Sequence, residues 1–135
     1  MLGSVPDEEI VIVADMEAGI GSLNRLEESA VDVTLVVVEP TPRSIDVARR
    51  GVHVADERQQ GRIVIVGNKI TGDADRQRIV DAFGDRPTVF VPEDQAIDAA
   101  DRRGTSPSDD ASDAPGVRAI EGIIDLLGLA VHVGS

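Results

Sequence analysis

Short runs of apolar residues, rich in valine and isoleucine, recur along the chain between more polar stretches: Ile10–Ala14, Val33–Val38, Ile63–Val66 and Thr88–Val91. Each run is continuous rather than alternating, which is typical of strands whose two faces are both covered by helices. Between the runs, apolar residues recur at helical spacing. The pattern therefore predicts an α/β fold in three layers, with a mostly parallel sheet flanked by helices.

Start and stop signals place helices between the predicted strands. Thr41 can cap a helix that has Pro42 at its first position and stops before Gly61. Asp73 can cap a second helix that ends at Gly84. The residues expected to pack on the sheet from these two helices are Ile45, Ala48, Val52, Ala55, Ile79, Val80 and Phe83.

Two further helices are expected near the end of the sequence, one ending near Gly104 and one running from about Pro115 to Gly128. Between them, residues 105–114 are small, polar, acidic or proline, so they bury too little apolar surface to become ordered. We expect a mobile loop there, within a single domain over residues 1–135. The stripe of the last helix is expected to contain Val117, Ile120, Ile124 and Leu127.

Composition excludes several classes of function. The 135 residues carry 25 acids against 13 bases, a formal net charge of -12, and such a surface repels nucleic acid and anionic lipid. Cysteine is absent, which rules out disulfides and cysteine-bound metals. The sequence shows neither a signal peptide nor an apolar run long enough to span a bilayer. A cytoplasmic protein without nucleic-acid or membrane partners is expected.

Polar residues follow the predicted strands, at the edge where parallel α/β sheets bind ligands. Asp15 follows the first run, and Gly19 comes shortly after it. An acid at a strand end before a glycine is how nucleoside triphosphatases hold Mg²⁺, although Asp15 alone could equally cap the next loop. Asn68 and Lys69 follow the third run, and an asparagine amide can both donate to and accept from a purine edge.

A resemblance to a known family rests on the segments Asp15-Met16-Glu17-Ala18-Gly19-Ile20, Val36-Val37-Val38-Glu39-Pro40-Thr41-Pro42-Arg43-Ser44, Asn68-Lys69, Pro92-Glu93-Asp94 and Ala100-Asp101-Arg102-Arg103-Gly104. In this order they resemble the MinD/ParA class of P-loop ATPases, from about Ile10 to Leu127. Within the class, the first segment is most similar to the carbon monoxide dehydrogenase accessory ATPases, which insert nickel. The resemblance implies ATP and Mg²⁺ as cofactors, and a protein partner or a homodimer.

The resemblance also implies roles for individual residues. Asp15 would be the catalytic acid at the end of the Walker B strand, acting on Mg²⁺ through water. Ala18 and Gly19 would lie in the switch segment that senses the γ-phosphate. Asn68 would contact adenine and Lys69 would flank the base.

The far wall of the base pocket would come from the backbone of Pro92, Glu93 and Asp94. In such enzymes the rate comes from positioning and from stabilising charge on the transferred phosphoryl group, so these contacts matter only when the phosphates are held.

The sequence departs from the family pattern in its phosphate chemistry. No Gly-x-x-x-x-Gly-Lys-Ser/Thr motif occurs, and the family places that loop ahead of the strand that ends at Asp15. The family's phosphate-loop strand would lie between the first two runs, so those runs pair directly, receive a strand from a partner, or leave an open edge. The nickel-binding Cys-x-Cys pair is also missing, and Gly21-Ser22 replaces a more polar pair.

Three hypotheses follow for function. The chain is a nucleotide-binding type of domain that does not hydrolyse ATP alone, or it is one part of a split ATPase completed by a partner that carries the phosphate loop. The third hypothesis is a receiver-like signalling module, which has a similar sheet. A receiver needs an aspartate after its third strand, where this chain has Gly67-Asn68-Lys69.

Overall fold

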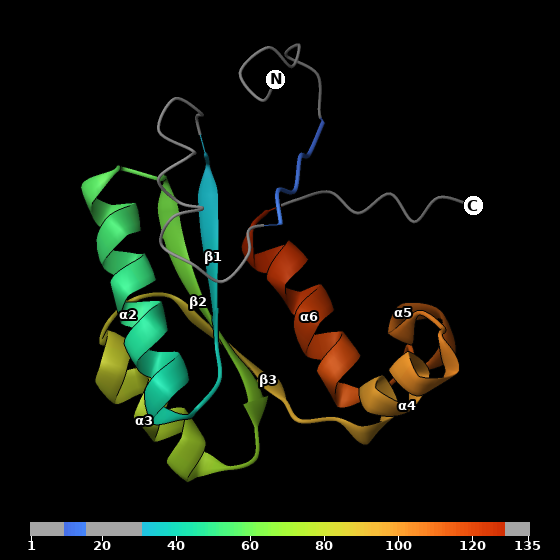
Figure 1. Ribbon diagram of the computed structural model, residues 1–135. Helices are drawn as coiled ribbons and strands as arrows, with labels where there is room; N and C mark the ends of the chain where they lie inside the picture. Colours follow the sequence, from blue (N-terminus) through green and yellow to red (C-terminus); the bar gives the residue numbers. More distant parts are fainter. Residues whose placement is uncertain (1–9, 16–30, 129–135) are drawn as a thin grey trace.

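The computed structural model describes residues 10–15 and 31–128, and their centre is a three-stranded parallel sheet (Figure 1). The strands are β1 (Val33–Val38), β2 (Arg62–Ile70) and β3 (Thr88–Pro92), in the spatial order β1-β2-β3. β1 pairs with β2 in parallel from Val33 opposite Arg62 to Val38 opposite Gly67. The predicted parallel sheet is confirmed, and three of the four apolar runs are its strands.

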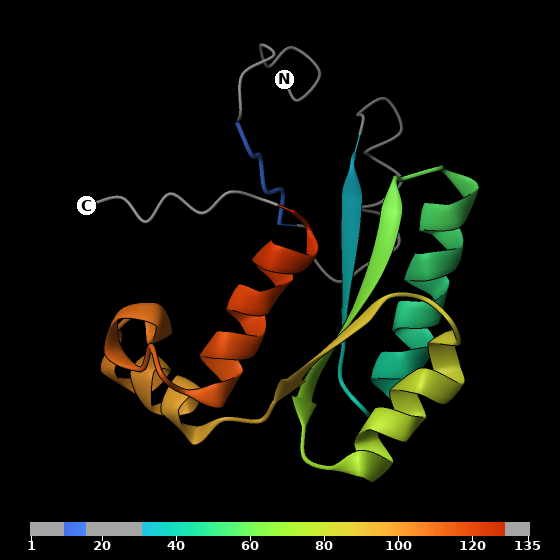
Figure 2. The same ribbon diagram turned by 180° about the vertical axis from the view of Figure 1, so that it is seen from behind.

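Helices cover the sheet on two faces, so the fold has the three layers that the sequence predicts (Figures 1 and 2). One face carries α2 (Pro42–Glu57) and α3 (Asp73–Phe83). On the other face, α6 (Pro115–Leu126) packs on β3, while α4 (Gln95–Arg103) and α5 (Pro107–Asp110) lie beside its start. No helix in the described part of the chain is long and apolar enough to cross a bilayer.

Two apolar clusters fill the space between these layers. The larger lies under α2 and α3, and its buried members are Val38, Ala48, Val52, Ala55, Ile63, Ile65, Ile70, Ile79 and Phe83. The smaller lies under α6, where Val66, Val91 and Ile123 are buried together. Ile63 and Ile65 of β2 thus face the larger cluster and Val66 faces the smaller one, as the period of a strand requires. Ile70 returns to the larger cluster because the pairing of β2 with β3 is irregular between Gly67 and Ile70.

The first predicted strand, Ile10–Ala14, does not form in the structure. Residues 10–15 adopt no strand, and Ile10, Val11, Ile12 and Val13 are 46–87% exposed. Apolar runs indicate a tendency to be buried, but a strand also needs a neighbour for its backbone N–H and C=O groups. In the described residues, this segment has no such neighbour.

The predicted helix boundaries are confirmed at α2 and α4. Thr41 caps α2, with its hydroxyl accepting from the backbone N–H of Ser44 at 3.2 Å, and Gly104 ends α4 in the left-handed conformation. The helix cap predicted at Asp73 is wrong, because Gly72 is the capping residue of α3 and Asp73 already lies in the first turn of that helix. An acid there is stabilised by the helix dipole, a role that sequence alone does not separate from a cap.

The predicted core stripes are partly wrong. Ala48, Val52 and Ala55 of α2 are buried as predicted, whereas Val80 of α3 and Ile120 of α6 are 43% and 48% exposed. Ile123 takes the buried position of α6 instead. The three strands offer α3 and α6 a narrow surface, so only part of each apolar stripe reaches the sheet.

The segment predicted as a mobile loop, residues 105–114, contains the one-turn helix α5. Polar contacts, not apolar burial, hold α5 in position. Arg103 forms an ion pair with Asp110, and the Thr105 hydroxyl donates to the same carboxylate at 3.2 Å. This ion pair lowers the pKa of Asp110. Residues 107–110 therefore form a helical turn rather than a loop, and the predicted mobility of the segment stays a prediction.

Candidate functional site

The carboxyl ends of the three strands gather most of the polar residues that the sequence singles out. Glu39 follows β1, Asn68 and Lys69 lie in the last residues of β2, and Glu93 follows β3. Because all three strands are parallel, these residues meet at one edge of the sheet. β2 is longer than the predicted run, so Asn68 and Lys69 belong to the strand instead of following it.

A bulge in β2 presents Asn68 and Lys69 at this edge. β2 advances from Gly67 to Ile70 while β3 advances only from Phe90 to Pro92. Lys69 takes a left-handed backbone conformation, with φ 56°, which is uncommon for a residue other than glycine. Asn68 is half-buried, and its side-chain amide hydrogen bonds to no other residue in the described ranges. The bulge therefore leaves one amide available to a ligand.

Lys69, the only lysine of the chain, forms an ion pair that joins the ends of β1 and β2. Its Nζ lies 2.9 Å from Glu39 Oε1, and both side chains are substantially exposed. The hydrogen bond to Glu39, together with the negative charges of Glu39, Asp98 and Glu93, raises the pKa of Lys69 above its ordinary value of 10.5. Lys69 is thus held by an acid within an acidic neighbourhood.

The ion pair predicts how Lys69 titrates. Since the pKa of Lys69 is higher in the folded chain than in the unfolded chain, the pair stabilises the fold at neutral pH, and this contribution is lost as the pH rises above 10.5. Glu39→Gln should move the midpoint back toward 10.5. NMR titration of the single lysine side chain measures both, and an unchanged midpoint in Glu39→Gln would show that the pair does not form in solution.

Asp94 holds two helices at this edge. Its Oδ1 accepts from the backbone N–H of Ala96 at 2.9 Å, which caps α4, and its Oδ2 accepts from the backbone N–H of Gly116 at 2.8 Å in the first turn of α6. A β-carbon on Gly116 would lie 2.7 Å from Ile97 Cδ1 and 3.0 Å from the β-carbon of Asp94, so the close approach favours glycine. The Asp94 carboxylate is therefore committed to backbone contacts.

Pro92 and Glu93 complete the wall beside the bulge. Pro92 pairs with Ile70 as the last residue of β3, and the backbone N–H of Glu93 donates to the Ile70 carbonyl at 3.0 Å. Glu93 also lines a hollow of about 670 Å³ with Gln95, Asp98, Ala99 and Arg102 of α4. The hollow is large enough for a small ligand.

Asp15 is not brought to this edge. Figures 1 and 2 show the segment 10–15 near the amino end of β1, away from the carboxyl ends of the strands. Ala18 and Gly19 lie outside the described residues. No group of three or more acids or histidines suited to a metal occurs in the described residues, and binding of Mg²⁺ by Asp15 through water stays a prediction.

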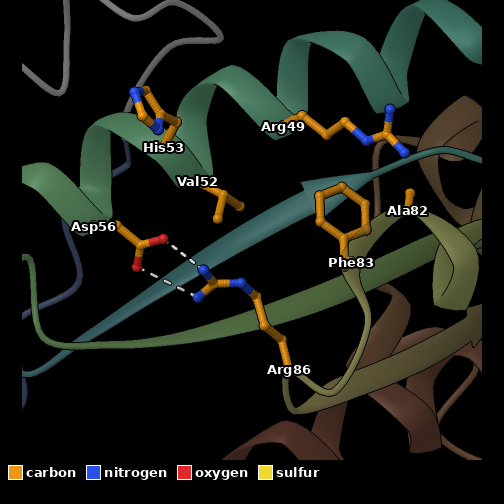
Figure 3. Close-up of a pocket in the computed structure, with 7 residues that line it drawn as sticks. All are labelled: Arg49, Val52, His53, Asp56, Ala82, Phe83 and Arg86. Carbon is orange, nitrogen blue, oxygen red and sulfur yellow. Dashed lines mark hydrogen bonds and ion pairs between the residues drawn. The ribbon is translucent and has the colours of Figure 1, made fainter.

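A second hollow, of about 260 Å³, lies between α2 and α3 (Figure 3). Its floor is apolar, and Arg86 and Asp56 face each other across it in a two-contact ion pair. It involves the last turns of both helices, which lead into the amino ends of β2 and β3. The hollow is thus remote from Asn68 and Lys69.

Sequence reasoning missed two contacts at this edge. Glu39 was visible as the acid after the second apolar run, but its pairing with Lys69 depends on the register between β1 and β2. The second cap made by Asp94 depends on Gly116, which lies 22 residues away in the sequence. A Pro-Gly pair at the start of the last helix was the available signal, because glycine often marks a close approach.

Curated proteins of two organisms are similar in sequence. The carbon monoxide dehydrogenase accessory protein CooC of Rhodospirillum rubrum is 33% identical over 96 residues, covering 70% of this chain and 36% of that protein. An uncharacterized ATP-binding protein of Methanocaldococcus jannaschii is 30% identical over 91 residues, covering 64% of this chain and 35% of that protein. The chain thus spans about a third of the length of these relatives. No family model matches it.

Solved structures share the fold. The cell division protein MinD of Aquifex aeolicus matches with a TM-score of 0.63 and 18% identity over 88% of this chain and 52% of its own. An ATP complex of a McdA variant from Cyanothece matches with a TM-score of 0.60 and 13% identity over 81% and 47%. The sequence relatives, together with the shared fold, support a MinD/ParA-class P-loop ATPase, and the chain spans part of the length of these proteins.

Proposed function

We propose that the chain binds the base of an adenine nucleotide at the carboxyl edge of its sheet. The observation that carries the proposal is the bulge in β2, which presents the half-buried amide of Asn68 without a partner in the described residues, beside Pro92 and Glu93. An asparagine amide matches the donor and acceptor pair on the edge of adenine. The ATP-binding name of one sequence relative supports the same ligand class.

Phosphate contacts are the weak part of this site. The sequence contains no phosphate-loop motif, and its single lysine is paired with Glu39. We therefore propose that the 135-residue chain binds nucleotide weakly and does not hydrolyse ATP alone. The Mg²⁺ expected for the family would arrive with the nucleotide.

Nucleotide binding by the isolated chain tests the proposal. Calorimetry with ATP, with adenosine and with inorganic phosphate should show binding of the first two only, because the base carries the affinity. Asn68→Ala should weaken binding by about tenfold, the value of one lost pair of hydrogen bonds. Gln77→Ala, which removes an exposed amide on α3, is the matched control.

Other outcomes would contradict the proposal. Equal binding by wild type and Asn68→Ala would remove Asn68 from the site, and binding of phosphate alone would move the affinity to another contact. Release of phosphate from ATP by the purified chain would overturn its proposed inability to hydrolyse. Asp15→Ala should have no effect, because the described segment 10–15 lies away from the edge.

A role in metalloenzyme maturation is the pathway that we propose for this domain. It rests on the similarity to CooC, an accessory protein of carbon monoxide dehydrogenase. Without cysteine, the chain would not carry nickel on thiolates, so its contribution would be to nucleotide-dependent protein contacts. A second candidate is one part of a split ATPase whose partner carries the phosphate loop, and it is favoured because β1 pairs with β2 alone within the described residues.

A further inference from the structure

The hollow between α2 and α3 has an apolar floor that consists of Val52, Ala82 and Phe83 (Figure 3). Val52 and Phe83 are buried, and Ala82 is half-buried. The volume of the hollow, about 260 Å³, lies below the range of about 300–1,000 Å³ that is usual for drug-sized ligands. The floor therefore suits a small apolar group, such as one aromatic ring or a short branched chain.

The charges that line the hollow favour an anion. Two arginines, Arg49 and Arg86, lie there against a single acid, Asp56, in a chain whose formal net charge is -12. Arg86 already holds Asp56 in an ion pair with two contacts, so this internal pair is neutral as a whole. The charge of Arg49 is left over. The hollow is therefore locally positive on an acidic protein.

Arg49 supplies the open hydrogen-bond donors of the hollow. Its side chain makes no hydrogen bond or ion pair with any residue in the described ranges, whereas Arg50, next to it on α2, pairs with Asp46 at 2.9 Å. In Figure 3 the Arg49 side chain extends toward the apolar floor and away from the internal ion pair. A guanidinium presents a planar fork of N–H donors that matches the two oxygens of a carboxylate.

The type of anion follows from the single free guanidinium. A phosphate group carries up to two negative charges and would meet one free arginine together with the carboxylate of Asp56. A carboxylate carries one charge, which Arg49 alone can balance. A singly charged carboxylate is therefore the better match.

We propose that this hollow binds a carboxylate joined to a small apolar group, with the carboxylate on Arg49 and the apolar group on the floor. A free small acid and the C-terminal residue of a polypeptide both present this chemistry. The hollow is remote from Asn68, because it lies toward the ends of α2 and α3 that lead into the amino ends of β2 and β3. Its occupation is thus independent of the proposed nucleotide binding.

Titration with phenylacetate, followed by amide NMR of the whole chain, tests this site. Phenylacetate combines one aromatic ring with one carboxylate, and phenylacetamide, which has a similar shape without the charge, is its control. A ligand of this size should bind with a Kd on the order of 1 mM and shift the amide signals of His53 and Phe83, which line the hollow. Phenylacetamide should bind about tenfold more weakly, because it lacks the charge-assisted hydrogen bonds to Arg49.

A short peptide distinguishes the two sources of the carboxylate. Acetyl-Gly-Gly-Phe with a free C-terminus should bind, and the same peptide with an amidated C-terminus should bind about tenfold more weakly. Tighter binding of the free peptide than of phenylacetate would assign the hollow to a polypeptide terminus. Weaker binding of the free peptide would assign it to a free small acid.

Matched variants assign the binding to this hollow. Arg49→Gln should weaken binding of phenylacetate by about tenfold, whereas Arg50→Gln, at the neighbouring arginine that does not line the hollow, should leave it unchanged. Ala82→Leu should abolish binding, because the larger side chain fills the floor. Asp56→Asn should strengthen binding severalfold, since it removes the acid that faces the ligand and frees Arg86.

Three results would rule out this site. The first is equal binding of phenylacetate by wild type and by Arg49→Gln, with circular dichroism showing that both are folded. The second is equal binding of phenylacetate and phenylacetamide, which would leave the carboxylate without a role. The third is the absence of shifts at His53 and Phe83 when phenylacetate is raised to about ten times the expected Kd.

Discussion

Gly61→Ala should lower the free energy of unfolding by roughly 3 kcal/mol, the sum of about 1–2 kcal/mol for a left-handed alanine and about 1–3 kcal/mol for displaced backbone. Gly61 has φ +69°, and a β-carbon there would lie 2.3 Å from the carbonyl oxygen of Val31 and 2.4 Å from that of Asp32. These are backbone atoms, so no side chain can rotate away. Urea unfolding followed by circular dichroism measures the loss.

Gly84→Ala is the matched control for Gly61→Ala. Gly84 has nearly the same backbone angle, φ +64°, but a β-carbon there would have no neighbour within 4 Å. Gly84→Ala should therefore lower the free energy of unfolding only by the cost of a left-handed alanine, about 1–2 kcal/mol. If the two variants lose equal stability, the contact between Gly61 and the residues before β1 does not form, and β1 does not begin where the structure places it.

Asp94→Ala should lower the free energy of unfolding by roughly 2–3 kcal/mol, because each capping hydrogen bond contributes about 0.5–2 kcal/mol. The carboxylate serves α4 through Ala96 and α6 through Gly116, and both backbone N–H groups would lose their acceptor. Since α6 covers the second face of the sheet, the loss should appear in global unfolding as well as in local fraying. Denaturant titration and amide exchange at Ala96 and Gly116 measure the two effects.

Asp94→Asn separates the two caps. An asparagine keeps one oxygen acceptor and replaces the other with an NH₂ group, which cannot accept a hydrogen bond. It should therefore lose about half of what Asp94→Ala loses. Exchange that accelerates at only one of Ala96 and Gly116 would show which contact survives. Full stability of Asp94→Ala would mean that water replaces both contacts and that Asp94 is free to take part in the base pocket.

Local signals in the sequence account for most of the secondary structure. The valine-rich run of β1 and the Thr41-Pro42 start of α2 are confirmed, because strand burial and helix capping depend on neighbouring residues in the chain. The run Ile10–Ala14 is rich in β-branched apolar residues, as β1 is, and yet forms no strand. Composition reports a tendency to be buried, and pairing needs a partner that a single segment does not specify.

The features of the fold and of the candidate site can likewise be separated into those that the sequence predicts and those that depend on tertiary contacts. The sequence by itself determined the parallel α/β fold, the family, and the chemistry at the strand ends, because these depend on residue type and order along the chain. Only the tertiary structure decided that Lys69 pairs with Glu39, that Asp94 caps two helices, and that β1 pairs with β2 alone among the described residues. These features depend on strand register, on a bulge and on contacts between residues distant in sequence, which are fixed only when the layers pack together.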